Sequence, residues 1–275
     1  MIFSGKDFRF ELGKKTYIMG ILNVTKDSFA DGGKYNTPQK AKAHVKEMLL
    51  QGADVIDIGA QSTRPDSQII SPQEELENIK QYLPFLANEF DCIISVDTFY
   101  PEVAEYALNN GASIINDVSG VFNVEMAQLV KKYDCGWIVM HTGGGNANTV
   151  PEYKNSVTDD VVEFFDNVLD KCDKMNIPHR NIMLDIGVGF GKTYEQNIEV
   201  IKNISKIKRD NVALLTALSL KRVVGTATDT EKEDRLFGTI SANSLAIANG
   251  TDFIRVHNVK EAVLGAKMAD ALVRG

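Results

Sequence analysis

Short apolar runs alternate with longer amphipathic segments along almost the whole chain. The apolar runs cover residues 16–24, 54–60, 92–98, 113–118, 136–141, 182–187, 212–219 and 253–257. Their length is typical of buried β-strands, and apolar residues at helical spacing fill most of the intervals between them. Eight strands alternating with helices in a chain of this length predict an α/β fold, a (β/α)8 barrel of the TIM type.

The helical pattern is clearest in two of these intervals, residues 157–175 and residues 198–207. In the second, the apolar stripe consists of Ile198, Ile201, Ile204 and Ile207. Before the first long strand, residues 8–15 alternate weakly and reach a turn signal at Leu12-Gly13-Lys14, which predicts a short N-terminal hairpin covering one end of the barrel. No linker or low-complexity segment divides the chain, so we expect one domain over residues 1–275.

Polar side chains recur at or near the carboxyl ends of the predicted strands. They are Asn23, Asp57, Asp97, Asn116, His141, Asp185, Ser219, Arg255 and His257. Any one of them alone is well explained as a helix cap or as a partner for a loop amide. Because strand ends of this kind share one rim of a barrel, and active sites of the fold are built on that rim, the set together predicts a functional site.

The segment Ile182–Thr193 is the most informative single stretch. Asp185 ends an apolar strand, three glycines alternate through the next loop, and Lys192 closes that loop. Glycines at such positions permit positive φ and close approach of the backbone to a ligand. The P-loop pattern fails because Ile186 stands where its first glycine belongs, and the dinucleotide pattern fails because Lys192 replaces its third glycine.

Three further segments carry candidate chemistry. The polar loops 23–33 and 61–66 are candidates for lids over a site. The last strand leads through Arg255 and His257 into the last helix, where Asn258 and Glu261 have the spacing of a capping box. Helix N-terminal amides beside Arg255 and His257 predict a phosphate or pyrophosphate site.

Composition narrows the class of protein. The chain has 275 residues, 44% of them hydrophobic and 24% charged, with a net charge of −7. Such a surface disfavours nucleic acid and anionic membranes as partners. The three cysteines lie in apolar patterns without C-x-x-C spacing, which indicates buried free thiols and a reducing compartment. With no signal segment or run of membrane length, we expect a cytoplasmic protein.

The ordered motifs resemble those of the dihydropteroate synthase family of pterin-binding enzymes. The matching segments are Gly20-Ile-Leu-Asn-Val-Thr25, Asp27-Ser-Phe-Ala-Asp-Gly-Gly33, Gly52-Ala-Asp-Val-Ile-Asp-Ile-Gly59, Ser62-Thr-Arg-Pro65, Ser95-Val-Asp-Thr98, Ile114-Ile-Asn-Asp117, Met140-His141, Leu184-Asp-Ile-Gly-Val-Gly-Phe-Gly-Lys192 and Arg255-Val-His257. The resemblance covers nearly the whole chain. It implies a (β/α)8 barrel and a reaction in which p-aminobenzoate displaces pyrophosphate from 7,8-dihydropterin-6-ylmethyl pyrophosphate, giving 7,8-dihydropteroate.

The resemblance also implies roles for particular residues. The pterin would be bound by Asp97, Asn116, Asp185 and Lys221, and the pyrophosphate by Asn23, Arg255 and His257, with Asn23 acting through Mg²⁺. The p-aminobenzoate would be bound by Thr63, Arg64, Phe190, Ser219 and Arg222. Catalysis would involve Asp97, Lys221, Asp31 and Arg64. The family further suggests a homodimer formed through outer helices and sensitivity to sulfonamides.

The chain departs from the family pattern mainly on the side of the second substrate. After strand seven it has Ser219-Leu-Lys-Arg222 where the family usually has Ser-Arg-Lys-Ser. Asp66 replaces a glycine, Lys26 a proline and Ala30 a serine in the two loops. Arg222 either pairs with the aminobenzoate carboxylate or crowds its site.

Two other functions fit part of the pattern. A non-catalytic pterin-binding paralogue would explain the changes at Leu220, Arg222 and Asp66. A methyltetrahydrofolate-dependent methyltransferase would explain Asp97, Asn116 and Asp185, but neither of the two loops nor the pair Arg255 and His257.

Overall fold

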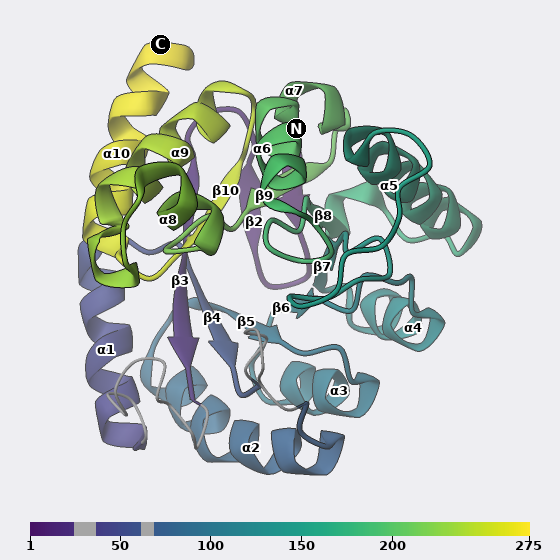
Figure 1. Cartoon of the computed structure of the whole chain (residues 1–275). Coiled ribbons are helices and arrows are strands. Elements are labelled where there is room, and N and C mark those ends of the chain that lie inside the picture. The colour runs from purple at the N-terminus through teal and green to yellow at the C-terminus, as the bar shows by residue number, and fades with distance from the viewer. Residues whose placement is uncertain (25–36, 62–68) are drawn as a thin grey trace.

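The computed structural model describes residues 1–24, 37–61 and 69–275, and its centre is a closed barrel of eight parallel strands (Figure 1). Around the barrel the strand order is β10-β3-β4-β5-β6-β7-β8-β9. The strands are β3 (Tyr17–Asn23), β4 (Val55–Gly59), β5 (Ile93–Asp97), β6 (Ile114–Asp117), β7 (Gly136–Met140), β8 (Ile182–Asp185), β9 (Ala213–Thr216) and β10 (Phe253–Val256). Each lies inside one of the eight predicted apolar runs, which confirms the (β/α)8 barrel.

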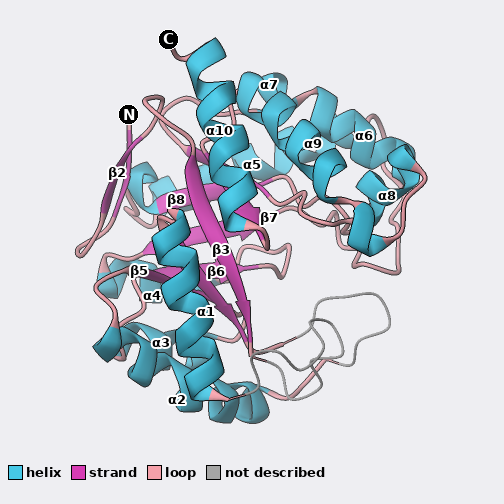
Figure 2. Cartoon of the chain, turned by 90° about the vertical axis from the view of Figure 1, so that its left-hand side faces the viewer, coloured by secondary structure: helices cyan, strands magenta, loops and turns pink. Residues whose placement is uncertain are grey.

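Helices surround the barrel and cover its outer face (Figure 2). They are α1 (Pro38–Gln51), α2 (Pro72–Glu89), α3 (Pro101–Asn109), α4 (Val124–Tyr133), α5 (Val157–Lys174), α6 (Tyr194–Lys202), α7 (Ile204–Ile207), α8 (Arg222–Thr228), α9 (Leu236–Ala248) and α10 (Val259–Val273). Single 3₁₀ turns are η1 (His179–Asn181) and η2 (Lys232–Asp234). Within the described ranges, no helix has both the length and the apolar character needed to cross a bilayer.

An aromatic plug closes the amino-terminal end of the barrel. Strands β1 (Ile2–Ser4) and β2 (Arg9–Glu11) form an antiparallel hairpin whose Phe3 and Phe10 pack against Phe253, at the start of β10. These rings belong to a buried cluster with the first inward-facing residues of several barrel strands. The opposite, carboxyl-terminal end of the barrel is therefore the end that is left for polar groups.

Two details of the predicted elements are wrong. The hairpin turns between β1 and β2, at residues 5–8, whereas Leu12-Gly13-Lys14 connects β2 to the barrel. The N-terminal strand pairs because Phe3 gains a place in the aromatic plug, a contact that local alternation does not reveal. The predicted helix over 198–207 is divided at Asn203 into α6 and α7, which both remain on the same apolar stripe.

Candidate active site

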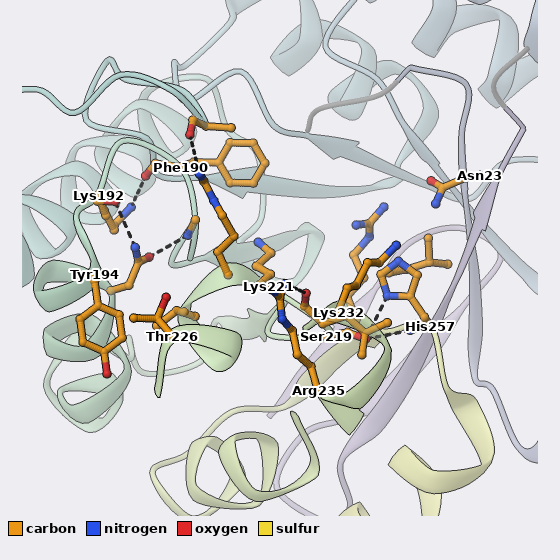
Figure 3. Close-up of a pocket in the computed structure, with 18 of the residues that line it drawn as sticks. Asn23, Phe190, Lys192, Tyr194, Ser219, Lys221, Thr226, Lys232, Arg235 and His257 are labelled. Atoms are coloured by element: carbon orange, nitrogen blue, oxygen red, sulfur yellow. Dashed lines mark hydrogen bonds between the residues drawn. The ribbon is translucent and has the colours of Figure 1, made fainter. Parts of the chain in front are cut away.

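A cavity of about 520 Å³ opens beside the carboxyl ends of the strands (Figure 3). Its described lining includes Asn23, Asp97, Phe190, Ser219, Lys221, Arg222, Arg255 and His257 among the predicted site residues. Other lining residues are Ile21, Gln61, Ala147, Gly189, Lys192, Tyr194, Asn197, Leu220, Val223, Thr226, Lys232 and Arg235. Six of these described residues are lysine or arginine and one is acidic, so the cavity is suited to anionic ligands.

The register of the sheet explains why distant polar residues meet here. Across neighbouring strands Asn23 is aligned with Gly59, Gly59 with Asp97, and Asp97 with Asn116. Since side chains in a strand alternate between two faces, aligned residues point to the same side of the sheet. The apolar pattern that fixes the register therefore also places these polar groups together inside the barrel mouth.

Arg255 joins two carboxylates at the centre of this end. Its Nε donates to Oδ2 of Asp57 at 2.6 Å, and its Nη2 donates to Oδ2 of Asp97 at 2.9 Å. Burial raises the pKa of Asp97 to about 7, against the lowering effect of Arg255. Arg255 was expected to hold pyrophosphate; it lines the cavity, but two of its N–H groups already serve Asp57 and Asp97.

Asn116 and Asp185 lie deeper than the cavity surface. Their exposed fractions are 1% and 4%, and neither lines the cavity. Asn116 donates from Nδ2 to Asp57 at 3.1 Å, and its buried Oδ1 has no hydrogen-bond partner within the part of the chain that the structure describes. Asp185 accepts the Gly187 N–H at 2.9 Å, and burial raises its pKa despite Lys221 nearby.

Lys221 and Phe190, which both line the cavity, contact each other. The Nζ of Lys221 lies 4.9 Å from the centre of the Phe190 ring and donates to the Val188 carbonyl. Burial lowers the pKa of Lys221 to about 8, while Asp185 opposes the shift. A cation over an aromatic face is attractive, so each side chain restrains the other.

An unusual backbone turn presents Lys221. Leu220 has a φ of 56°, in the left-handed region, which costs a non-glycine residue about 1–2 kcal/mol. Its N–H donates to the Thr239 hydroxyl at 3.1 Å, and its carbonyl accepts from Arg235 at 3.1 Å. These two contacts on either side of one residue hold the turn.

Three further predicted site residues line the cavity. Two of them, Ser219 and His257, contact each other, whereas Arg222 reaches a separate loop. Ser219 Oγ lies 3.0 Å from Nδ1 of His257. Arg222 is exposed and donates to the Ala147 carbonyl at 3.0 Å, so it reaches across to the loop after β7. Asn258 precedes α10, but its side chain makes no capping hydrogen bond, so the predicted capping box is wrong.

Part of the predicted site falls outside the described residues. Asp31 lies in 25–36, and Thr63, Arg64 and Asp66 lie in 62–68. The expectations for these residues therefore stay predictions.

The sequence pattern missed several residues that build the site. Arg235, in the segment between α8 and α9, supports the Leu220 turn. The sequence marks Lys192 and His141 separately, but not the contact between them, nor the contact of His141 with Asp160 of α5. Asp160 carries no sequence signal of its own, because an acid in the first turn of a helix is ordinary.

Asn23 is the side chain proposed for Mg²⁺. Across the described ranges, no group of three or more His, Cys, Asp or Glu residues could hold a metal ion by itself. A hard cation that is bound through one protein oxygen and the oxygens of a phosphate ligand suits the chemistry of Mg²⁺. The donor set at Asn23 fits that description only together with a bound pyrophosphate.

Comparisons with known proteins agree with this geometry. A profile of the family described as pterin binding enzyme matches residues 19–257. A dihydropteroate synthase from Clostridium beijerinckii is 40% identical, over 96% of this chain and 97% of its own. The chain belongs to the dihydropteroate synthase family. It is accordingly an enzyme, and a transferase.

Solved structures of this family are similar over nearly their full length. A dihydropteroate synthase from Clostridium difficile, determined in the presence of pteroic acid, has a TM-score of 0.89 at 40% identity and covers 97% of this chain and 100% of its own. One from Yersinia pestis, in a complex with a sulfonamide drug, has a TM-score of 0.91 at 32% identity over 99% of both chains. Neither the methyltransferase nor the non-catalytic paralogue is favoured by these relatives.

Proposed function

We propose that this chain joins 7,8-dihydropterin-6-ylmethyl pyrophosphate to p-aminobenzoate. A C–N bond forms between the aromatic amine and the pterin methylene, the C–O bond to pyrophosphate breaks, and its electron pair leaves with pyrophosphate. The amine loses one proton. The observation that carries the proposal is the strongly basic cavity at the end of the barrel, with Asp97 as the single acid among its described lining residues.

The pterin ring is assigned to the deepest part of the site. Its amino-pyrimidinone edge is rich in N–H donors, and the Asp185 carboxylate accepts two such donors in charge-assisted hydrogen bonds. A buried amide oxygen without a partner costs about 1–3 kcal/mol, so a ligand donor reaching Oδ1 of Asn116 would be favoured. Lys221 lines the cavity and lies near Asp185, so it would also contact the pterin ring.

Asp97 is assigned to stabilise charge as the reaction proceeds. In a dissociative displacement the C–O bond breaks before the C–N bond is complete, and positive charge spreads over the pterin methylene. A fixed carboxylate that lines the cavity favours that charge as it develops. Lys221 would bind the pterin so that its methylene lies near Asp97.

The leaving pyrophosphate is assigned to the side of the cavity formed by β3 and β10. Asn23, Arg255 and His257 would hold it there, with Asn23 acting through Mg²⁺. When bound, the ion supplies positive charge that offsets the charge on the leaving group. The remaining N–H groups of Arg255 would contact phosphate oxygens while Asp57 and Asp97 keep its guanidinium oriented.

The second substrate is assigned to the outer side of the cavity. Phe190 would pack on the aminobenzoate ring, while Ser219 and Arg222 would lie near its carboxylate. Asp31, Thr63 and Arg64 are proposed to close over this substrate and exclude water, because water attack on the cation would lose product.

The experiment is a coupled assay for pyrophosphate release with the dihydropterin pyrophosphate, Mg²⁺ and p-aminobenzoate. Release that depends on aminobenzoate and yields dihydropteroate supports the proposal. Release without aminobenzoate would mean that the cation forms and the second site is defective. Pterin binding with no release would instead favour the non-catalytic paralogue.

Replacing Arg222 with serine is expected to raise the KM for p-aminobenzoate about two- to fivefold, because an exposed ion pair contributes up to about 1 kcal/mol. The KM for the pterin substrate should stay within error, since Arg222 is at the outer mouth. Steady-state kinetics with each substrate varied in turn measures both constants. Arg180→Ser, which breaks an exposed ion pair with Asp134, is the control. Equal changes in both KM values would show that Arg222 does not contact the aminobenzoate carboxylate.

We also propose a homodimer formed through α9 and α10, which lie together on the outside of the barrel (Figure 1). Both helices expose large apolar side chains, eight positions apart on α9 and at i,i+4 spacing on α10. On α9 these are Phe237 and Leu245, and on α10 they are Leu264, Met268 and Leu272, with exposed fractions of 60–80%. An apolar patch of this kind on two packed helices is typical of a protein interface.

The double substitution Leu264→Glu and Met268→Glu is expected to give a monomer, because burying two new carboxylates in an interface is unfavourable. Sedimentation velocity measures the change. Leu50→Glu on α1, at a position outside α9 and α10 that is 79% exposed, should leave the assembly unchanged. A parent protein that sediments as a monomer would contradict the proposal.

We further place the protein in the cytoplasm, where its three free cysteines would remain reduced.

A further inference from the structure

The ammonium group of Lys192 is turned away from solvent, although Lys192 lines the cavity. The residue is 7% exposed. Its Nζ donates to the carbonyls of Gly187 and Phe190, each at 3.1 Å. It also lies 3.3 Å from the His141 carbonyl and 3.0 Å from Nδ1 of the same residue. A buried ammonium is costly unless it is fully hydrogen-bonded. The four acceptor atoms around Nζ therefore offset the cost of burying it.

The contacts continue outward from Lys192 to the surface. Since Nδ1 of His141 accepts from Lys192, the ring proton is assigned to Nε2, which donates to Oδ1 of Asp160 at 2.7 Å. Burial, with Lys192 nearby, lowers the pKa of His141 to about 4, so the ring is neutral at ordinary pH. Asp160 is 42% exposed and stands in the first turn of α5.

Lys192 cross-links both ends of one tight loop. The loop folds so closely against the end of β7 that a Cβ on Gly187 would lie 1.8 Å from the His141 carbonyl oxygen. The Gly187 N–H donates to the Asp185 carboxylate, and the carbonyl of the same residue accepts from Nζ of Lys192. The Phe190 carbonyl binds the same Nζ. One ammonium thus restrains Gly187, whose N–H donates to Asp185, and Phe190, whose ring lines the cavity.

We propose that Lys192, supported by His141 and Asp160, is a positioning residue for both substrates. It acts through the loop backbone, with Asp185 on the pterin side and Phe190 on the aminobenzoate side. The inference rests on the proposed function of Asp185 and Phe190.

Lys192→Met tests the ammonium, because methionine keeps most of the apolar stem. We expect the Kd for 6-hydroxymethyl-7,8-dihydropterin and the KM for p-aminobenzoate each to rise about tenfold or more, since small misplacements of a bound reactant are costly. The matched control is Lys208→Met. Lys208 donates to Asp252 and to the Gly250 carbonyl, just before β10 at the opposite end of the barrel. It should lower Tm without moving either constant.

Asp160 provides a second test that leaves the barrel interior intact. Asp160→Leu removes the acceptor for His141, whereas Asp160→Asn keeps one. We expect the leucine variant to raise both constants in the same direction as Lys192→Met, and the asparagine variant to match the parent. Asp159→Leu, which breaks the neighbouring exposed pair with Lys206, is the control and should also match the parent.

The inference is overturned if folded Lys192→Met keeps the parent constants, if Lys208→Met shifts them equally, or if Asp160→Leu equals Asp160→Asn. If Lys192→Met does not fold, the Asp160 variants decide. Failure of the proposed function is a separate result: the parent chain would then form no dihydropteroate. In that case the Kd for the pterin still tests whether Lys192 positions Asp185.

Discussion

Replacing Asp185 with asparagine is expected to weaken binding of 6-hydroxymethyl-7,8-dihydropterin by about 30- to 150-fold, the equivalent of about 2–3 kcal/mol for a lost charge-assisted hydrogen bond. Asparagine keeps the shape of the side chain, but its NH₂ group meets a ligand N–H donor where a carboxylate oxygen stood. Titration calorimetry without aminobenzoate measures the change in Kd.

The fold should tolerate this substitution. Burial raises the pKa of Asp185, which means that the folded protein disfavours its charged form, and a neutral amide avoids that cost. The matched control is Asp117→Asn. Asp117 is also buried at a strand end, but it serves the Ser119 N–H and the Trp137 indole. An unchanged Kd in Asp185→Asn, or an equal loss in Asp117→Asn, would refute the pterin assignment.

The barrel and its rim were predictable because both follow from local patterns. Each strand is a short apolar run, and each candidate polar residue stands where such a run ends. Parallel register then aligns Asn23, Gly59, Asp97 and Asn116 without any further information. Periodicity therefore accounts for which residues share the rim.

Pairings between distant residues were not predictable in the same way. The chain separates Arg255 from Asp57 by 198 positions, and neither residue indicates the other. The hairpin turn was misplaced for a similar reason: Phe3 is buried by Phe253 at the far end of the chain. The sequence marks Lys192 as the end of a loop, but not its contact with His141 at the end of β7, nor the contact of His141 with Asp160 of α5. Such contacts depend on tertiary packing, which determines how each polar group is satisfied.

Replacing Asp97 with asparagine is expected to lower kcat on the order of 10²- to 10³-fold, the usual effect of removing one preorganised group that stabilises transition-state charge. The affinity for the pterin should fall much less, because the charge that Asp97 stabilises is absent from the ground state. Pyrophosphate release under saturating substrates measures kcat.

The pH dependence of kcat/KM provides a second test of the role of Asp97. Asp97 acts as a carboxylate, and burial raises its pKa to about 7, so lowering the pH through about 7 protonates it and should reduce kcat/KM. The acid limb should be absent from the residual activity of Asp97→Asn. If the limb persists at the same pH in that variant, another group titrates there.

The control separates the charge of Asp97 from its hold on Arg255. Asp57→Asn also disturbs Arg255, through the 2.6 Å contact to Nε, but Asp57 is fully buried and does not line the cavity. If Asp97 mattered only by orienting Arg255, the two variants would lose similar activity and weaken pyrophosphate binding alike. A far larger loss of kcat in Asp97→Asn would instead place its carboxylate beside the methylene on which charge develops, since only a charge next to the reacting carbon distinguishes the transition state from the bound substrate.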